Sequence, residues 1–125
     1  MFKIFGGTNR SNPENGKDLK LELIDMDQWS QLLTESETRP VFIFKHSSRC
    51  GTSSMVLRRF EKKMYEWEQP YYFLNIFSHR GLSNMIAETL NVRHESPQLI
   101  VLKHGKVFKH ESHFGILDIL QSVPH

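Results

Sequence analysis

Apolar residues gather in five short stretches of the chain, and their patterns predict five β-strands. The stretches are residues 19–24, 41–44, 71–77, 98–103 and 106–110. The first alternates Leu19, Leu21 and Leu23 with polar residues, as a half-buried strand does. The second and third, "VFIF" and "YYFLNIF", are almost continuously apolar, which is typical of strands covered on both faces. His104-Gly105 joins the last two, and because Gly accepts a positive φ this pair predicts a tight hairpin.

Apolar residues that recur three or four positions apart predict four helices. These are residues 27–36, the segment from Cys50 to Pro70, residues 81–92 and a C-terminal segment with Ile116, Leu117 and Leu120. Asp27 and Ser112 stand near the predicted starts of the first and last helices. Their side-chain oxygens can accept hydrogen bonds from the unpaired N–H groups of a first helical turn, so we expect both to be N-caps.

The predicted order of elements is β-α-β-α-β-α-β-β-α. Strands separated by helices are joined by right-handed parallel crossovers, while the terminal hairpin must be antiparallel. We therefore expect an α/β fold with a mixed central sheet of about five strands, helices on both faces, a C-terminal hairpin and a final helix. The strand at residues 41–44 is expected near the centre, so Cys50 would lie at the sheet edge where open α/β folds bind ligands.

One folded domain is predicted over residues 19–125. Residues 6–18 contain Gly, Asn and Pro but no large apolar side chain, so residues 1–18 are predicted to form a flexible lead. A chain of 125 residues is long enough for one domain around a single core.

Charge and cysteine content narrow the class of protein. Lys and Arg number 16 and Asp and Glu number 14, a surplus too small to indicate nucleic acid or an anionic membrane as partner. The sequence has neither a signal-peptide h-region nor an apolar run long enough to span a bilayer. One cysteine cannot form an internal disulfide, so we expect a cytoplasmic protein held by packing alone. The sequence leaves the oligomeric state open.

Cys50, between a predicted strand and a predicted helix, is the candidate nucleophile. A free thiol with a pKa of about 8.5 is only ~3% thiolate at pH 7. At the start of a helix, the N–H groups of Thr52 and Ser53 and the helix dipole would stabilise the thiolate. Ser53 also carries a hydroxyl at the position where a dithiol enzyme places its second cysteine.

Positive charge near the thiol would lower its pKa further. Arg49 directly precedes Cys50, and Lys45 and His46 lie a few residues earlier. The alternative is that Cys50 is a small buried hydrophobe, which is the usual condition of free cysteines. Its Ser, Arg, Gly and Thr neighbours favour the exposed nucleophile.

Ser96-Pro97 precedes the strand at residues 98–103. Pro can simply open a strand at a position whose N–H needs no partner. The other possibility is a cis peptide bond, which occurs in about 5–6% of X–Pro bonds. The sequence pattern leaves both open.

These elements together resemble the thioredoxin fold, and four segments resemble the monothiol bacilliredoxin (YtxJ-like) family more closely. The segments are "FKHSSRCGTSSM", "AETLNV", "SPQLIVLKHGKV" and "ESHFGI", and the similarity covers about residues 19–121. The resemblance implies a cis-proline at Pro97 facing Cys50. It also implies that Cys50 attacks mixed disulfides between protein cysteines and bacillithiol or another low-molecular-weight thiol. Ser96 would hold the substrate through its backbone.

The resemblance implies no tightly bound cofactor, with bacillithiol or another small thiol as co-substrate and S-thiolated client proteins as partners. The chain departs from better-known members, which read Thr-Cys-Pro-Ile-Ser where this chain reads "RCGTS". Gly51 lacks the fixed φ that Pro supplies at a first helical turn. This departure keeps a second function open, a non-catalytic binding or scaffold module in which Cys50 is inert or merely modified.

The single cysteine has a mechanistic consequence. Cys50 cannot release a bound thiol by forming an internal disulfide, so the second thiol must come from solution. The sequence therefore predicts a monothiol route through mixed disulfides.

His113 is a further candidate, in the loop before the last helix. It would act as an acid or base toward the thiol; the alternative is a solvated surface histidine. The histidines are scattered without a paired ligand motif, so no metal site is expected.

Overall fold

The computed structural model describes residues 19–49 and 51–121, and within them the elements follow the predicted order. The strands are β1 (Lys20–Glu22), β2 (Val41–His46), β3 (Tyr71–Asn75), β4 (Gln98–Lys103) and β5 (Lys106–Ser112). The helices are α1 (Met26–Glu35), α2 (Gly51–Trp67), α3 (Arg80–Leu90) and α4 (Gly115–Ile119). The predicted flexible lead lies outside the described residues. In the described part of the chain, no helix is both long and apolar enough to span a membrane.

The five strands form one mixed sheet in the order β1-β3-β2-β4-β5, which confirms the predicted architecture. β3 pairs in parallel with β1 and β2, whereas β4 pairs antiparallel with β2 and β5. Phe44 of β2 stands opposite Phe73 of β3 on one side and Leu99 of β4 on the other. The strand that leads to Cys50 is therefore central, as predicted.

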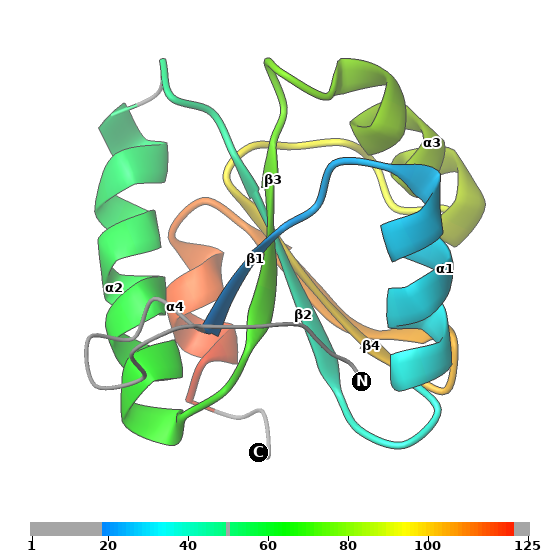
Figure 1. Ribbon diagram of the computed structural model, residues 1–125. Helices are drawn as coiled ribbons and strands as arrows, with labels where there is room; N and C mark the ends of the chain where they lie inside the picture. The colour runs from blue at the N-terminus through cyan, green and yellow to red at the C-terminus, as the bar shows by residue number, and fades with distance from the viewer. Residues whose placement is uncertain (1–18, 50, 122–125) are drawn as a thin grey trace, which may run out of the picture.

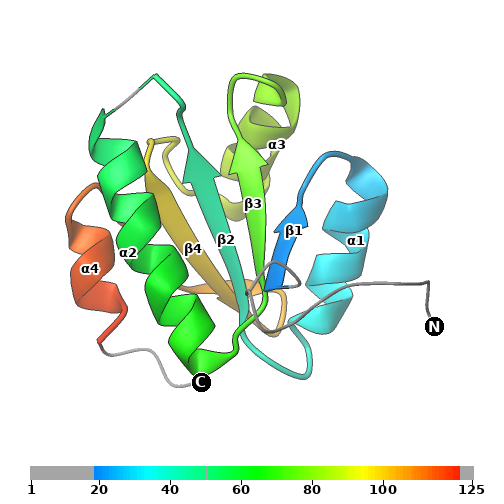
Figure 2. The same cartoon turned by 60° about the vertical axis from the view of Figure 1, so that its left-hand side comes forward.

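Helices cover both faces of the sheet, with α1 and α3 on one side and α2 and α4 on the other (Figures 1 and 2). Successive residues of β2 feed the two resulting cores. Phe42 and Phe44 pack with residues of α2 and α4, while Val41 and Ile43 pack with residues of α1 and α3. A central strand with both faces buried must be apolar at successive positions, which accounts for "VFIF".

The N-cap of α1 is Asp25, so the prediction of Asp27 is wrong. The Asp25 carboxylate accepts the N–H of Gln28 at 2.9 Å, and the Gln28 side-chain oxygen accepts the N–H of Asp25 at 3.3 Å. This reciprocal pair is a capping box, and it fixes the helix start at Met26. Asp27 falls in the first turn, where its negative charge still favours the helix dipole.

The prediction that Ser112 caps the last helix is also wrong. Ser112 ends β5, opposite Gln98, and α4 begins three residues later with Phe114 at the N-cap and no side-chain cap bond. Ser112 belongs to β5 because the pairing between β4 and β5 extends to Gln98 and Ser112. The predicted turn at its other end is confirmed, with φ of 55° at His104 and 72° at Gly105.

Two strand predictions need adjustment at their ends. β3 ends at Asn75 rather than residue 77 because the Asn75 side chain accepts the N–H groups of Phe77 and Ser78, at 3.0 and 3.3 Å, and turns the chain. In β1, Leu21 is 38% exposed while Leu23 is fully buried. β1 has only three residues and lies at the edge of the sheet. Leu21 and Leu23 therefore do not share the one buried face that the alternating pattern predicted.

Candidate functional site

The candidate site lies between the end of β2 and the start of α2, at the C-terminal edge of the central strand (Figure 2). Cys50 itself lies outside the described residues, and the site is built from the residues on either side. Arg49 before it is exposed, and Gly51 after it is the first residue of α2 and is also exposed. Thr52 follows as a half-buried residue of the first helical turn.

Ser53 is fully buried beneath this turn. Its Oγ lies 2.8 Å from Nδ1 of His46 and accepts the N–H of Ser47 at 3.2 Å. Both partners belong to the end of β2, so one hydroxyl ties the strand to the first turn of the helix across residues 48–50. At the position where a dithiol enzyme has its second cysteine, this chain therefore has a hydroxyl that hydrogen-bonds β2 to α2.

His46 packs inside the protein with only 8% of its surface exposed, and its ring centroid lies 5.4 Å from that of Phe73. Burial lowers the pKa of His46 below its ordinary value, and the charge of Lys20 lowers it further, while Glu61 opposes the change. The imidazole is therefore neutral at pH 7. The sequence-based expectation that His46 adds positive charge near the thiol is wrong.

Lys45 points to the opposite face of the sheet and is fully buried. Its Nζ donates to the backbone oxygen of Ser83 in α3 at 3.2 Å. Burial lowers the pKa of Lys45 to about 8, so the ammonium remains mostly protonated at pH 7. Ser83 continues the polar contact through its Oγ, 3.2 Å from Nδ1 of His94, whose pKa burial also lowers.

The peptide bond between Ser96 and Pro97 is cis, as the family resemblance implied. Pro97 is buried and directly precedes β4. The Oγ of Ser96 and Oε1 of Gln98 are buried atoms with no hydrogen-bond partner among the described residues. Gln98 is anchored at its other end, where Nε2 donates to the backbone oxygen of Arg93 at 2.8 Å.

His113 lies between β5 and α4, in the predicted loop, and its backbone contacts the cis-proline. Its backbone N–H donates to the oxygen of Pro97 at 3.0 Å, and its φ of 56° is left-handed. The imidazole Nδ1 lies 3.6 Å from a carboxylate oxygen of Glu95, with both side chains partly exposed. The structure thus brings together the cis-proline loop, His113 and a carboxylate that the sequence analysis missed.

Other residues of this edge were also missed. Ser83 and Glu95 carry no local motif, because they contact Lys45 and His113, which lie far from them in the chain. His94 contacts Ser83, and Gln98 contacts Arg93, at spacings that match no known motif. A signal was present for Phe77, an aromatic residue two positions after an Asn that closes a buried strand. Asn at such a position often accepts backbone N–H groups two residues on, which predicts a turn that presents the next side chains.

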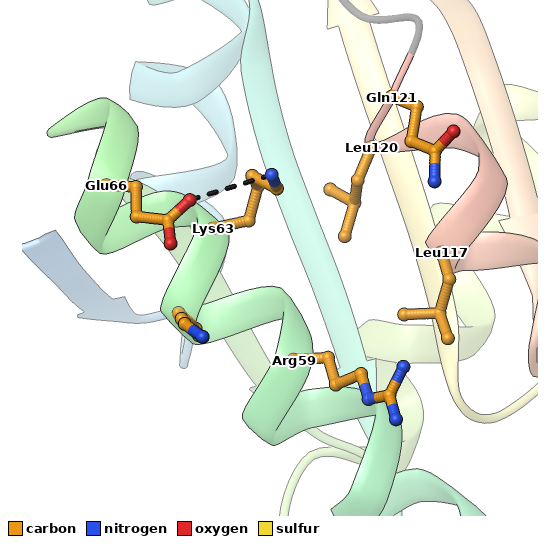
Figure 3. Close-up of a pocket in the computed structure, with 7 residues that line it drawn as sticks. Arg59, Lys63, Glu66, Leu117, Leu120 and Gln121 are labelled. Carbon is orange, nitrogen blue, oxygen red and sulfur yellow. Dashed lines mark ion pairs between the residues drawn. The ribbon is translucent and has the colours of Figure 1, made fainter.

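A groove of about 470 Å³ lies elsewhere, between α2 and α4 (Figure 3). Leu117 of α4 and Leu120, which caps the end of that helix, point toward α2. α2 contributes Arg59 and the ion pair between Lys63 and Glu66. The α2 residues that line it begin about two turns beyond the start of that helix, so the groove is separate from the candidate site. Across residues 19–49 and 51–121, no three His, Cys, Asp or Glu side chains lie together as metal ligands would.

Known proteins resemble this chain at the level of both sequence and fold. The family model described as monothiol bacilliredoxin BrxC matches residues 21–119. A solved structure of a protein described as a candidate oxidoreductase with a thioredoxin fold shares 31% identity, and the match covers 85% of this chain and 96% of the other, with a TM-score of 0.75.

More distant structures share the fold alone. The thioredoxin of Trypanosoma brucei brucei is 18% identical, with 81% of this chain and 84% of the other covered and a TM-score of 0.65. Thioredoxin f from spinach chloroplast is also 18% identical, with 82% and 91% covered and a TM-score of 0.64. At these identities the likeness establishes a thioredoxin fold.

Proposed function

This chain belongs to the monothiol bacilliredoxin family, and from that premise we propose that it removes a low-molecular-weight thiol from mixed disulfides on protein cysteines. Cys50 is the nucleophile. The small thiol is bacillithiol in hosts that make it, and the partners are S-thiolated client proteins. Family and fold already support a thiol-oxidoreductase role, and the identity of the small thiol is the finer part of the proposal.

The monothiol route is supported by the burial and hydrogen bonding of Ser53. The chain has one cysteine, and the position where a second would stand holds a serine whose hydroxyl is buried and engaged by His46 and Ser47. No internal thiol can displace a group bound to Cys50, so release depends on a thiol from solution.

The reaction consists of two thiol-disulfide exchanges. The Cys50 thiolate attacks the small-thiol sulfur of protein–S–S–R, which forms Cys50–S–S–R and releases the protein thiolate. A second R–S⁻ then attacks the R sulfur of that adduct, which forms R–S–S–R and restores the Cys50 thiolate. Across the two steps, the client cysteine is released as a thiol, one free small thiol is consumed, and it leaves joined in R–S–S–R to the small thiol removed from the client, with no tightly bound cofactor taking part.

Several described residues support these steps. The backbone at Ser96 and the cis-proline Pro97 would hold the client in an extended pose. His113, beside Pro97, would protonate the departing protein thiolate. The reaction needs a reducing compartment, and we place it in the cytoplasm.

Intact-mass measurement of the purified protein tests the proposal. On mixing with bacillithiol disulfide at neutral pH, we expect one added thiol at Cys50, removed again by excess thiol. Cys50→Ser should stay unmodified, with circular dichroism confirming that it is folded. A wild-type protein that is folded but forms no adduct would instead be a binding or scaffold module.

A further inference from the structure

Arg49 and Phe77 form an exposed stacked pair beside the candidate site. The guanidinium carbon lies 4.7 Å from the centroid of the Phe77 ring, and the ring is 46% exposed. Within residues 19–49 and 51–121, the Arg49 side chain has no hydrogen bond or ion pair to a protein group beyond this stacking contact. No group in this part of the chain therefore occupies the N–H groups of the guanidinium.

The turn after β3 fixes the aromatic half of this pair. The Asn75 side chain accepts the N–H of Phe77 at 3.0 Å, and the N–H of Ile76 donates to the backbone oxygen of His46 at 3.0 Å. The side chain of Ile76 in this turn is buried. These bonds tie the turn to the end of β2, so Phe77 is presented from a backbone that several contacts hold in place.

Stacking suits an arginine that must recognise an anion. An aromatic face attracts the flat side of the guanidinium and leaves its N–H edge free, and that edge matches a carboxylate in a bidentate arrangement. Holding the side chain in advance also lowers the conformational entropy lost when a ligand binds. A lone surface arginine would lack both advantages.

Among the residues that the structure describes, no carboxylate forms an ion pair with the Arg49 guanidinium. Glu95, a carboxylate at this end of the sheet, lies 3.6 Å from the imidazole of His113 instead. Such a surface attracts a negatively charged substrate, and the attraction weakens with added salt.

We infer that Arg49, held by Phe77, is a specificity-determining residue that binds a carboxylate of the low-molecular-weight thiol in the mixed disulfide. Arg49 directly precedes Cys50 in the chain, so a thiol joined to Cys50 brings its own charged groups near the guanidinium. The inference rests on the proposed function and adds the substrate feature that the site selects.

Two effects of Arg49 must be separated in the test. If the arginine only favoured the thiolate form of Cys50, its loss would slow exchange with every substrate, and the loss would fade at a pH where the thiol is fully ionised. If it binds a carboxylate, its loss slows exchange with anionic substrates alone and does so at high pH as well.

The experiment uses one cysteine peptide that carries three different small thiols by disulfide linkage. These are 3-mercaptopropionate, which is anionic, 2-mercaptoethanol, which is neutral, and cysteamine, which is cationic. Exchange rates are measured for the whole protein at low ionic strength, at pH 7 and again at pH 9.5. Wild-type protein should prefer the anionic over the neutral substrate by about 3- to 10-fold, and 0.5 M salt should reduce that preference.

Arg49→Gln should abolish the preference for the anionic substrate at pH 7 and at pH 9.5, whereas any loss that all three substrates share at pH 7 should disappear at pH 9.5, where the thiol is ionised. Phe77→Leu should weaken the preference without abolishing it, because the aromatic face that holds the guanidinium is lost. Arg58→Gln, which removes one exposed charge elsewhere on α2, should keep it. Equal rates for the three substrates, or an equal loss with all three in Arg49→Gln, would overturn the inference. Absence of exchange with any of them would instead overturn the proposed function.

Discussion

The hydroxyl of Ser53 and the imidazole of His46 are joined inside the protein, with 2.8 Å between Oγ and Nδ1. The same oxygen accepts the N–H of Ser47, so its own proton is free to be donated to a neutral Nδ1. This single side chain connects the end of β2 with the first turn of α2, the two segments that flank Cys50 in the sequence. The spacing of a dithiol site is retained while its second thiol is replaced by a structural hydrogen bond.

Ser53→Ala should lower the free energy of unfolding by about 1–3 kcal/mol, because it leaves the N–H of Ser47 and Nδ1 of His46 buried without a partner. Urea denaturation at pH 7.5 measures the change. Ser54→Ala, one position further along α2 and half-buried, is the matched control and should change stability by less than about 0.5 kcal/mol. Equal losses of stability in the two variants would show that the hydrogen bonds of Ser53 to His46 and Ser47 add no specific stability.

Periodicity predicted the elements, their order and the central place of β2 because each depends on local apolar spacing. The helix caps were wrong for a local reason as well. Asp25 and Asp27 both offer a carboxylate, and the choice between them is made by Gln28, whose side chain reaches back to the Asp25 N–H. A capping box requires the partner three residues on, and Asp27 has Ser30 there, whose shorter side chain does not complete that box.

The site was predicted less completely because its contacts cross between elements. His46 follows Lys45 directly, and the sequence indicated only that both could place positive charge near the thiol. The sheet continues through both residues, so His46 is buried under α2 and Lys45 under α3. Burial then decides their charge states, which no local pattern could reveal. The stacking of Arg49 on Phe77 likewise joins two loops that are neighbours only in the folded chain.

Lys45→Met should stabilise the protein at pH 7. Burial lowers the pKa of Lys45 from 10.5 to about 8, a difference that corresponds to ~3 kcal/mol at most. The unfolded chain binds the proton more tightly, so the wild-type protein should gain stability as pH rises from about 8 to 10.5. The variant should lack that rise and should be about 1–3 kcal/mol more stable below pH 8.

Urea denaturation between pH 7 and 10.5 tests the lysine prediction. The exposed Lys62→Met serves as control and should stay within about 0.5 kcal/mol of wild type at pH 7. If Lys45→Met is less stable than wild type at pH 7, the hydrogen bond to Ser83 outweighs the cost of burying the charge.

His46 should make the protein less stable in mild acid. Its pKa is lowered in the folded state, so below about pH 6.5 the unfolded chain takes up a proton first, and stability falls as pH drops toward the folded-state pKa. One such proton contributes at most about 1.4 kcal/mol per pH unit. His46→Asn should flatten the fall between pH 6.5 and 5, while its difference from wild type should be constant above pH 7.5. An unchanged acid slope in the variant would contradict the neutral buried state.

His113→Asn should slow release of the client thiol without disturbing the fold. Asn tolerates the left-handed backbone at this position, where φ is 56°, but it cannot donate a proton as an acid. We expect at least a 10-fold slower release at pH 6.5 to 7.5, on the scale of a general acid that contributes about 10²-fold or more. Single-turnover release of a labelled peptide thiol measures it. Unchanged release across this pH range would leave His113 with only its backbone contact to Pro97.

Ser53→Cys should convert the site from a monothiol to a dithiol. Cysteines three residues apart form the Cys-X-X-Cys arrangement, in which the second thiolate attacks the disulfide at the first. Once Cys50 carries a small thiol, the variant should release it without external thiol and retain an internal disulfide, two hydrogen masses lighter than the reduced chain. Intact mass after removal of excess reagent distinguishes this product from the stable adduct of the wild type.

Thr52→Cys, which places the new thiol one residue earlier, should keep the adduct. Ser53→Cys could also keep its adduct while circular dichroism shows that it is folded. In that case a thiol buried at position 53 cannot attack the disulfide at Cys50, and the monothiol route depends on the packing around His46 as well as on the absence of a second cysteine.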